Sequence, residues 1–250
     1  AVAAASRALA RPVKWIEDRR ENLLSAGHSR NECAHMRLAV DDDGIIQAIT
    51  GDHVCDVGAY AVCPAGMDPM LLPGPYKTPR LGFSIEMVWT NTMGKAAYRG
   101  PWMFETTARE MAIDYTAHEI GIDPAEFRRR NLLAFDDLPF TSPSGNVFKE
   151  ITPLETFEQA LAMLDLSEFR RAQAAARADG RLVGLGVCAY VEPTSMGAPT
   201  LATEGATVRV ESSGRVVAYL GATAHGQSIE TTMAQIVADR LGVDPSVVEV

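Results

Sequence analysis

Residues 90–133 hold the strongest local pattern in the chain, and they read TNTMGKAAYRGPWMFETTAREMAIDYTAHEIGIDPAEFRRRNLL. After a polar loop, apolar residues recur at helical spacing, which predicts a helix with one buried stripe. That stripe comprises Phe104, Ala108, Met111, Ala112 and Tyr115. Gly121 ends this helix, and Asp123-Pro124-Ala125-Glu126 starts another, because aspartate caps a helix and proline suits its first position. A loop followed by two helices is therefore expected.

The second helix ends in three arginines: Arg128, Arg129 and Arg130. Cationic side chains suit the negative end of a helix dipole. The run is therefore expected to form a solvated or dipole-paired turn, and a nucleic-acid patch is not expected from it.

Strands are expected upstream of these helices. Residues 35–40 and 45–50 flank Asp41-Asp42-Asp43-Gly44, and an Asp-Gly pair accepts the positive φ angles of a tight hairpin turn. Residues 51–62 can extend this sheet, and residues 80–90 predict a further strand.

The other upstream segments are less regular. Residues 1–10 predict a helix that stops before Pro12, and residues 13–16 are a short strand candidate. Residues 64–80 hold five prolines and two glycines, which predicts a long irregular loop. Loops of this length in a compact domain often carry function.

Downstream, residues 152–164 and 167–178 predict two capped helices, and Asp179-Gly180 marks a boundary after them. The pattern then becomes β, with a strand at 183–191. A hairpin follows, formed by residues 206–211 and 216–220, and then a helix that Gly242 closes.

The predicted fold class is α+β, with mixed sheets and helices packed on them. Two subdomains are expected, one spanning residues 1–179 and the other residues 180–250.

Composition limits the classes of function. The chain has 250 residues, of which 47% are hydrophobic and 22% charged, so it is a globular protein and not a disordered or fibrous one. A formal net charge of -9 disfavours nucleic acid as a partner, because an acidic chain repels phosphate. No 18-residue apolar run and no basic-then-apolar leader occur, so we expect no membrane span and a cytoplasmic location.

Cysteine and histidine spacing predicts no metal site. The four cysteines form no CxxC pair: Cys33, Cys55, Cys63 and Cys188. Reduced thiols are expected, with no iron–sulfur cluster bound by this chain. Three histidines match no ligand motif: His28, His35 and His53.

Two turns that each lead into a helix are the candidate sites. Residues 97–102 hold Arg99 beside Gly100, which combines a planar fork of donors with a close backbone approach. Residues 225–228 hold Gly226 and Gln227 before the last helix, which Ser228 can cap. Each pattern alone also fits an alternative without a binding role. The first could be an ordinary arginine in a loop, and the second an ordinary capped helix.

Residues 90–133 resemble the molybdenum-hydroxylase superfamily, which includes xanthine dehydrogenases, aldehyde oxidases and the large subunits of aerobic carbon monoxide dehydrogenases. Three further segments resemble it in the family's order: PVKWIEDRRENLL (12–24), DVGAY (56–60) and HGQSIETTMAQIVADRLGV (225–243). The resemblance covers nearly the whole chain.

The resemblance implies roles for seven residues. In the family, an Ala-Tyr-Arg-Gly loop lies against the molybdenum centre, and it matches Ala97, Tyr98, Arg99 and Gly100, with Arg99 as the catalytic residue. A Gly-Gln-Gly turn contacts the pterin, and it matches Gly226, Gln227 and Ser228. Ser228 departs from the family's glycine, which adds bulk at the contact.

The resemblance also implies the chemistry and the partners. It predicts hydroxylation of a small-molecule substrate with water as oxygen source, on molybdopterin in its plain or cytosine dinucleotide form. Iron–sulfur clusters and FAD are expected on two partner subunits. The family's first cofactor loop and active-site glutamate match no segment here, so we expect the chain to be a piece of the large subunit, inactive alone.

One residue of the sequence limits the class of substrate that the resemblance implies. Family members specialised for carbon monoxide carry a cysteine after the Tyr-Arg pair to hold copper, where this chain has Gly100. An aldehyde or an N-heterocycle is therefore expected. The alternatives are a non-catalytic binding or assembly module of such a complex, and an unrelated α+β ligand-binding domain.

Overall fold

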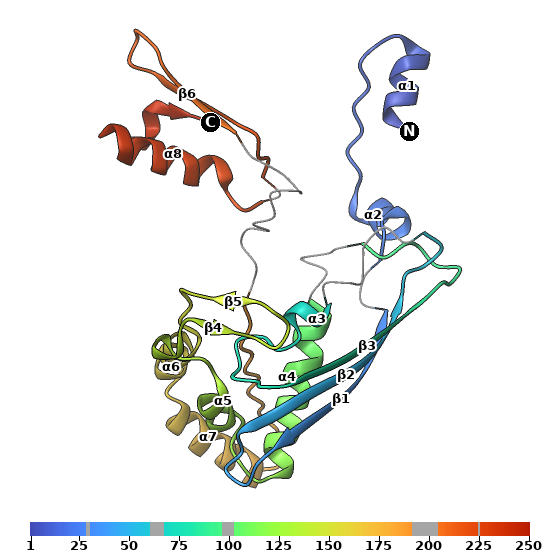
Figure 1. Cartoon of the computed structure of the whole chain (residues 1–250). Helices are drawn as coiled ribbons and strands as arrows, with labels where there is room; N and C mark the ends of the chain where they lie inside the picture. The colour runs from blue at the N-terminus through green and yellow to red at the C-terminus, as the bar shows by residue number, and fades with distance from the viewer. Residues whose placement is uncertain (29–30, 61–67, 97–102, 192–204, 225) are drawn as a thin grey trace. The chain divides into compact units, whose positions relative to one another are not determined.

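The computed structural model describes the whole chain except residues 29–30, 61–67, 97–102, 192–204 and 225. The chain divides into two compact units, residues 1–191 and 192–250 (Figure 1). Each unit combines a small sheet with helices, so the predicted α+β class is confirmed. The subdomain boundary expected at residues 179–180 stays a prediction.

A three-stranded sheet organises the first unit. Its strands are β1 (Glu32–Val40), β2 (Ile46–Asp56) and β3 (Leu81–Val88), in the order β1-β2-β3. β1 and β2 are antiparallel, while β2 and β3 are parallel. Gly44 turns the hairpin at a φ of 76°, and Asp41 Oδ1 accepts a hydrogen bond from Ile45 N at 2.8 Å. The predicted hairpin and the strand after the proline-rich loop are confirmed.

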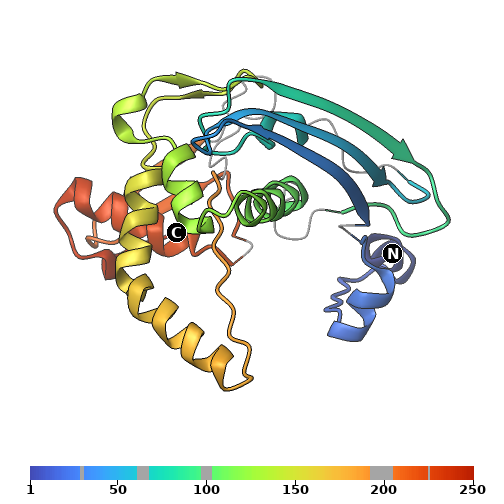
Figure 2. The same ribbon diagram turned by 90° about the horizontal axis from the view of Figure 1, so that it is seen from below.

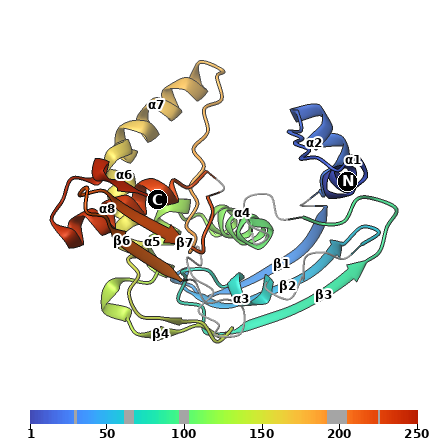
Figure 3. The same cartoon turned by 90° about the horizontal axis from the view of Figure 1, so that it is seen from above.

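Two helices follow the sheet. α4 (Met103–Glu119) lies in the concave side of the curved sheet, and α5 (Pro124–Asn131) comes directly after it (Figures 2 and 3). Asp123 caps α5 through a 2.8 Å hydrogen bond from Ala125 N, as predicted. The remaining elements of this unit are α1 (Val2–Leu9), α2 (Arg19–Ser25), α3 (Asp68–Leu71), η2 (Phe135–Asp137), β4 (Phe140–Thr141), β5 (Val147–Phe148), α6 (Pro153–Leu164) and α7 (Leu166–Ala178).

The predicted buried stripe of α4 is wrong for Met111 and Tyr115, while Phe104, Ala108 and Ala112 are half-buried. Met111 is 67% exposed and Tyr115 is 73% exposed. The helix instead buries the face that carries Glu105, Arg109, Glu110, Ile113 and Ala117. A charged face can be buried when its charges are paired, and here the partners come from segments distant in sequence.

Glu110 is the centre of that buried face. Its Oε1 accepts hydrogen bonds from Arg109 Nε and from the Tyr76 hydroxyl, both at 3.0 Å. Its Oε2 accepts from Arg128 Nε and from Ala189 N, also at 3.0 Å. One carboxylate thus joins the proline-rich loop, α4, α5 and residues 181–191. Arg128 is fully buried, so of the two alternatives, a solvated or a dipole-paired turn, the solvated one is wrong for that residue.

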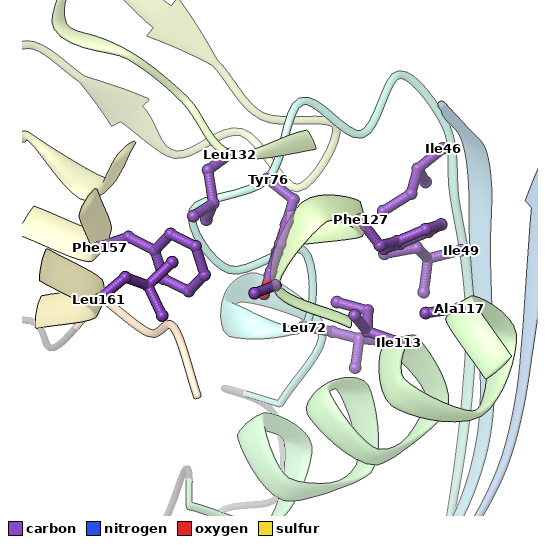
Figure 4. Close-up of a cluster of buried hydrophobic side chains, with 11 residues drawn as sticks. Ile46, Ile49, Leu72, Tyr76, Ile113, Ala117, Phe127, Leu132, Phe157 and Leu161 are labelled. Carbon is purple, nitrogen blue, oxygen red and sulfur yellow. The ribbon is translucent and has the colours of Figure 1, made fainter. Parts of the chain in front are cut away.

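Figure 4 shows the apolar core of this unit, and Tyr76 belongs both to that core and to the Glu110 network. The clustered buried side chains are Ile46, Ile49, Leu72, Tyr76, Ile113, Ala117, Ala125, Phe127, Leu132, Phe157 and Leu161. They come from strand β2, from the loop that follows α3, and from helices α4, α5 and α6 with the residue just after α5. The helices and the sheet therefore share one core.

Two strand predictions are wrong. Residues 13–16 form no strand, and Trp15 and Ile16 are 55% and 75% exposed, because no neighbouring strand among the described residues pairs with them. Residues 183–191 likewise have no strand assignment, although Val187 and Ala189 pack on the core. The helix predicted at 1–10 is confirmed as α1, and the helices predicted at 152–164 and 167–178 are confirmed as α6 and α7.

The second unit is a smaller sheet with one long helix. β6 (Ala206–Val210), β7 (Val216–Leu220) and β8 (Val248–Glu249) are ordered β6-β7-β8, and α8 (Ile229–Leu241) packs on them. Its core comprises Val216, Ala238 and Val248, and η3 (Pro245–Val247) precedes β8. The predicted hairpin and final helix are confirmed. Within the described residues, no helix is both long and apolar enough to cross a membrane.

Arg128→Met tests the buried network. We expect it to lower the free energy of unfolding by about 3–5 kcal/mol, because Glu110 stays buried with less compensating charge. Arg171→Met is the control, since Arg171 pairs with Glu168 at a side-chain exposure of 73%, and its loss is expected to be below about 0.5 kcal/mol. Urea unfolding followed by circular dichroism measures both. Equal small losses would contradict the role of Arg128.

Candidate functional site

The two candidate turns are described to different extents. Ala97, Tyr98, Arg99 and Gly100 lie outside the described residues, as does His225. Gly226, Gln227 and Ser228 are described and lie in the second unit. For the first turn, the structure therefore gives the two segments that hold it on either side.

The segment before the first turn is held by backbone hydrogen bonds. Ala96 N donates to His28 O at 2.8 Å, and Lys95 N donates to Val57 O at 3.4 Å. Packing is tight here, because a Cβ placed on Gly27 would lie 2.6 Å from Ala96 Cβ. The chain thus enters residues 97–102 from a fixed position.

A buried ion pair strengthens this anchor. Lys95 Nζ pairs with the carboxylate of Glu32 on β1, and the side chains are only 4% and 2% exposed. Burial disfavours the charged ammonium, but the hydrogen bond and the charge of Glu32 outweigh it and raise the pKa of Lys95. Lys95 therefore stays charged, and it ties the loop entrance to the sheet.

Asp56 and Gly58 support the same entrance from the end of β2. Asp56 Oδ1 accepts hydrogen bonds from Thr90 Oγ1 at 2.7 Å and from Gly58 N at 2.8 Å, and these bonds lower the pKa of Asp56. Gly58 has a φ of 66°, and a Cβ there would lie 2.1 Å from Met93 O. Only glycine fits this crossing of two backbones.

The segment after the first turn begins α4 at Met103. Glu105, in the first turn of the helix, is fully buried. Nearby, His53 is 2% exposed and lies edge-on to Phe83 and Phe104, with ring centroids 4.7 and 5.3 Å away. Burial lowers the pKa of His53, so its ring is neutral at physiological pH. Both sides of residues 97–102 thus rest on buried polar side chains.

The second turn has an unusual backbone. Gly226 has a φ of 109°, and Ser228 has a left-handed φ of 58° immediately before α8. Gly226 is exposed, and a Cβ placed on it would meet no described atom within 4 Å.

Ser228 does not cap α8 through its side chain. It stands at the cap position, but its hydroxyl makes no capping hydrogen bond within the described part of the chain, and its carbonyl accepts from Thr232 N at 3.0 Å. Residues that cap through their side chains usually have an extended backbone, whereas Ser228 is left-handed, although the left-handed Asp165 does cap α7 through its carboxylate. The expected capping role is therefore wrong, and the N–H groups of the first turn of α8 are not covered by the Ser228 hydroxyl.

Sequence patterns missed the supporting residues of the site. Glu32 and Lys95 are 63 positions apart, and no local spacing links them. Glu105, Arg109, Ile113 and Ala117 do recur at i, i+4, i+8 and i+12, which was an available signal for the buried face of α4. Among the described residues, no group of three or more His, Cys, Asp or Glu side chains could hold a metal ion.

Comparison with known protein families shows which family this chain belongs to. The models of two molybdopterin cofactor-binding domains match residues 1–132 and residues 159–250. The chain belongs to the molybdopterin cofactor-binding domain family.

Two of its curated relatives are named as enzyme subunits. It is 34% identical to the gamma subunit of the 6-hydroxypseudooxynicotine dehydrogenase complex of Paenarthrobacter nicotinovorans, over 98% of this chain and 32% of that protein. It is also 34% identical to the nicotine 6-hydroxylase large subunit of the same organism, over 96% of this chain and 31% of that protein. The chain spans about a third of the length of these relatives.

A solved structure agrees closely with the fold. Quinoline 2-oxidoreductase from Pseudomonas putida 86 matches 99% of this chain and 34% of its own, with 38% identity and a TM-score of 0.89. The reconstituted CO dehydrogenase from Oligotropha carboxidovorans matches 99% of this chain and 34% of its own, with 25% identity and a TM-score of 0.80. The similarity therefore covers both units of this member of the family.

Gly58→Ala tests the loop entrance. The new methyl group would meet the Met93 carbonyl in a left-handed backbone, so we expect a loss of about 3 kcal/mol or more in unfolding free energy. Gly145→Ala is the matched control, because Gly145 also has a positive φ, 91°, but its Cβ would have no described atom within 4 Å. Its loss is expected to be about 1 kcal/mol. Thermal unfolding separates the two, and equal losses would contradict the close approach.

Ser228→Ala tests the uncapped turn. We expect a change below about 0.5 kcal/mol in unfolding free energy, because the hydroxyl makes no cap. Asp123→Ala removes a carboxylate that does cap a helix, so it is expected to lose about 1 kcal/mol. Guanidinium unfolding of both variants provides the comparison. A loss at Ser228 as large as the loss at Asp123 would show that the hydroxyl does cap α8.

Proposed function

We propose that this chain is the cofactor-facing part of the large catalytic subunit of a molybdenum hydroxylase. The enzyme would hydroxylate an N-heterocycle or an aldehyde with water as the oxygen source. The observation that carries the proposal is the agreement with quinoline 2-oxidoreductase over 99% of this chain at a TM-score of 0.89. Matches to two cofactor-binding domains in one chain add support.

The described residues fit such a cofactor. The exposed Gly226, together with a first helical turn that the Ser228 hydroxyl does not cap, suits a group that carries anionic oxygens. In this proposal, Gly226 permits a close approach of the backbone, Gln227 offers amide donors and an acceptor, and Ser228 completes the turn. When bound, the molybdenum cofactor supplies the two-electron oxidation of a carbon–hydrogen bond.

Arg99 is the proposed catalytic residue. Its guanidinium would hold an oxygen of the substrate or cofactor through a planar fork of donors, with Ala97, Tyr98 and Gly100 forming the loop around it. The anchored segment at Lys95 and the start of α4 at Met103 support this role, because rigid flanks hold a short loop in position.

An N-heterocycle is the preferred substrate class. Gly100 stands where carbon monoxide enzymes of the family carry a copper-binding cysteine, which disfavours carbon monoxide. The names of the nicotine and quinoline enzymes among the relatives support a nitrogen ring.

The remaining parts of the proposal concern the assembly. Residues 1–179 and 180–250 would form parts of two cofactor-binding subdomains. Molybdopterin would be bound in its plain or cytosine dinucleotide form, with the rest of the large subunit, an iron–sulfur subunit and an FAD subunit as partners. The relatives support this, because they are named as the large or gamma subunits of complexes. We expect a cytoplasmic enzyme, with this chain inactive alone.

Arg99→Ala in the full enzyme tests the catalytic proposal. Loss of one charge-stabilising donor is expected to lower turnover about 100-fold or more. Molybdenum content and melting temperature are expected to stay at wild-type values. Arg171→Ala, on an exposed helix face, is the control and is expected to keep full turnover.

Two results would contradict the proposal. Unchanged turnover in Arg99→Ala would remove that residue from the active site. A full-length protein without stoichiometric molybdenum, which still binds partner subunits, would instead favour a non-catalytic assembly module.

A further inference from the structure

A lysine, a cysteine and a glutamate meet in the interior of the first unit. Lys95 Nζ donates a hydrogen bond to Cys55 Sγ at 3.3 Å and pairs with Glu32. Cys55 Sγ lies 3.7 Å from Glu32 Oε1. Cys55 is 1% exposed on β2, and the lysine side chain is 4% exposed. Three reactive groups from three segments are thus held together out of bulk water.

We propose that Lys95 and Cys55 form an oxidative cross-linking site, in which one oxygen atom bridges Nζ and Sγ. Two single bonds through one oxygen span somewhat less than the observed 3.3 Å, and the lysine side chain can shift by that amount. The described structure puts the Lys95 nitrogen in contact with the sulfur, and this nitrogen becomes nucleophilic once its proton has passed to Glu32.

The reaction balances with molecular oxygen as the oxidant. One ammonium, one thiol and one O₂ give one N–O–S bridge, one water and one proton. The O–O bond breaks, N–O and S–O bonds form, and the nitrogen and the sulfur each lose two electrons. Two molecules of hydrogen peroxide can replace O₂, with three waters as product. Four electrons and four protons from thiol reductant restore the lysine, the cysteine and one water.

Glu32 gives the site a route for the released proton. The bridged nitrogen is far less basic than an ammonium, so the ion pair is lost when the bridge forms. A carboxylate left alone in the interior would be strongly destabilising. Glu32 can take up the proton that leaves Lys95, which removes both charges together. The pairing of Glu32 with Lys95 thus makes the cross-link compatible with burial.

The bridge would act on the loop entrance. Lys95 lies two residues before residue 97 and is already joined to Val57 and Glu32. The covalent link would replace the hydrogen bond between Lys95 Nζ and Cys55 Sγ, and it would fix Lys95 to β2. The proposed modification therefore sits beside the candidate active-site loop, but its formation does not require the proposed catalytic activity.

Mass spectrometry of the full polypeptide tests the proposal. The protein is held in oxygenated buffer or dilute hydrogen peroxide, then unfolded, alkylated, digested and mapped. We expect the peptides with Cys55 and Lys95 to become joined, with a mass about 14 Da above the sum of the linear masses, whereas sulfenic acid adds about 16 Da. Dithiothreitol is expected to release the two peptides unmodified.

Variants separate the bridge from ordinary thiol oxidation. Lys95→Arg keeps the charge beside Glu32 but cannot form the bridge, so the joined peptide is expected to disappear, as in Cys55→Ser. Lys77→Arg is the matched control, because Lys77 pairs with Asp137 at the surface, and it is expected to keep the joined peptide. The alkylation state of exposed Cys33 reports that the oxidant acted.

Two outcomes in the wild-type protein would overturn the proposal. One is Cys55 that is still alkylated after Cys33 has been oxidised. The other is Cys55 that carries only sulfenic or sulfinic acid, with Lys95 found in unmodified peptides. Both outcomes are measured on the natural sequence, so neither depends on the folding of a variant.

Discussion

The first unit is organised around one carboxylate, that of Glu110, buried on α4. Water is excluded from it, so its charge is tolerated only because Arg109, Arg128 and the Tyr76 hydroxyl all bond to it. These partners belong to three segments, and a fourth contributes Ala189 N. Packing of the proline-rich loop, α5 and residues 181–191 against α4 is therefore linked, because displacing any one of them leaves charge unpaired in the interior.

The same kind of constraint supports the candidate site. Lys95 and Glu32 pair in the interior at the entrance to residues 97–102, and Gly58 lets two backbones cross beside them. A buried ion pair with little exposure holds Lys95 in one position against the sheet. The turn in the second unit has no such buried ion pair among its described residues. Gly226 and Ser228 are exposed, and the Ser228 hydroxyl does not cap the start of α8.

Expectations from sequence and the structure differ most on α4. Apolar periodicity placed Met111 and Tyr115 in the core, yet both are exposed, and the buried face carries Glu105, Arg109 and Glu110. The apolar stripe was real as a pattern, but Ala34, Met36 and Leu38 of β1 border it only from one side, leaving a shallow groove. Periodicity detects that a helix has two faces, and it selects the wrong one when the charges on the other face find partners.

Local chemistry along the chain was sufficient for the hairpin at Gly44, the cap at Asp123 and most helices, and the resemblance of its motifs was sufficient for the family. These features rest on residues within a few positions of one another, or on motifs that survive in order. Which face of α4 is buried, the pairing of Glu32 with Lys95 and Cys55, and the uncapped turn at Ser228 were set only by the tertiary structure. The physical reason is that a buried charge destabilises the fold unless a partner of opposite charge or a hydrogen bond compensates it. Here the compensating partners come mostly from distant segments of the chain.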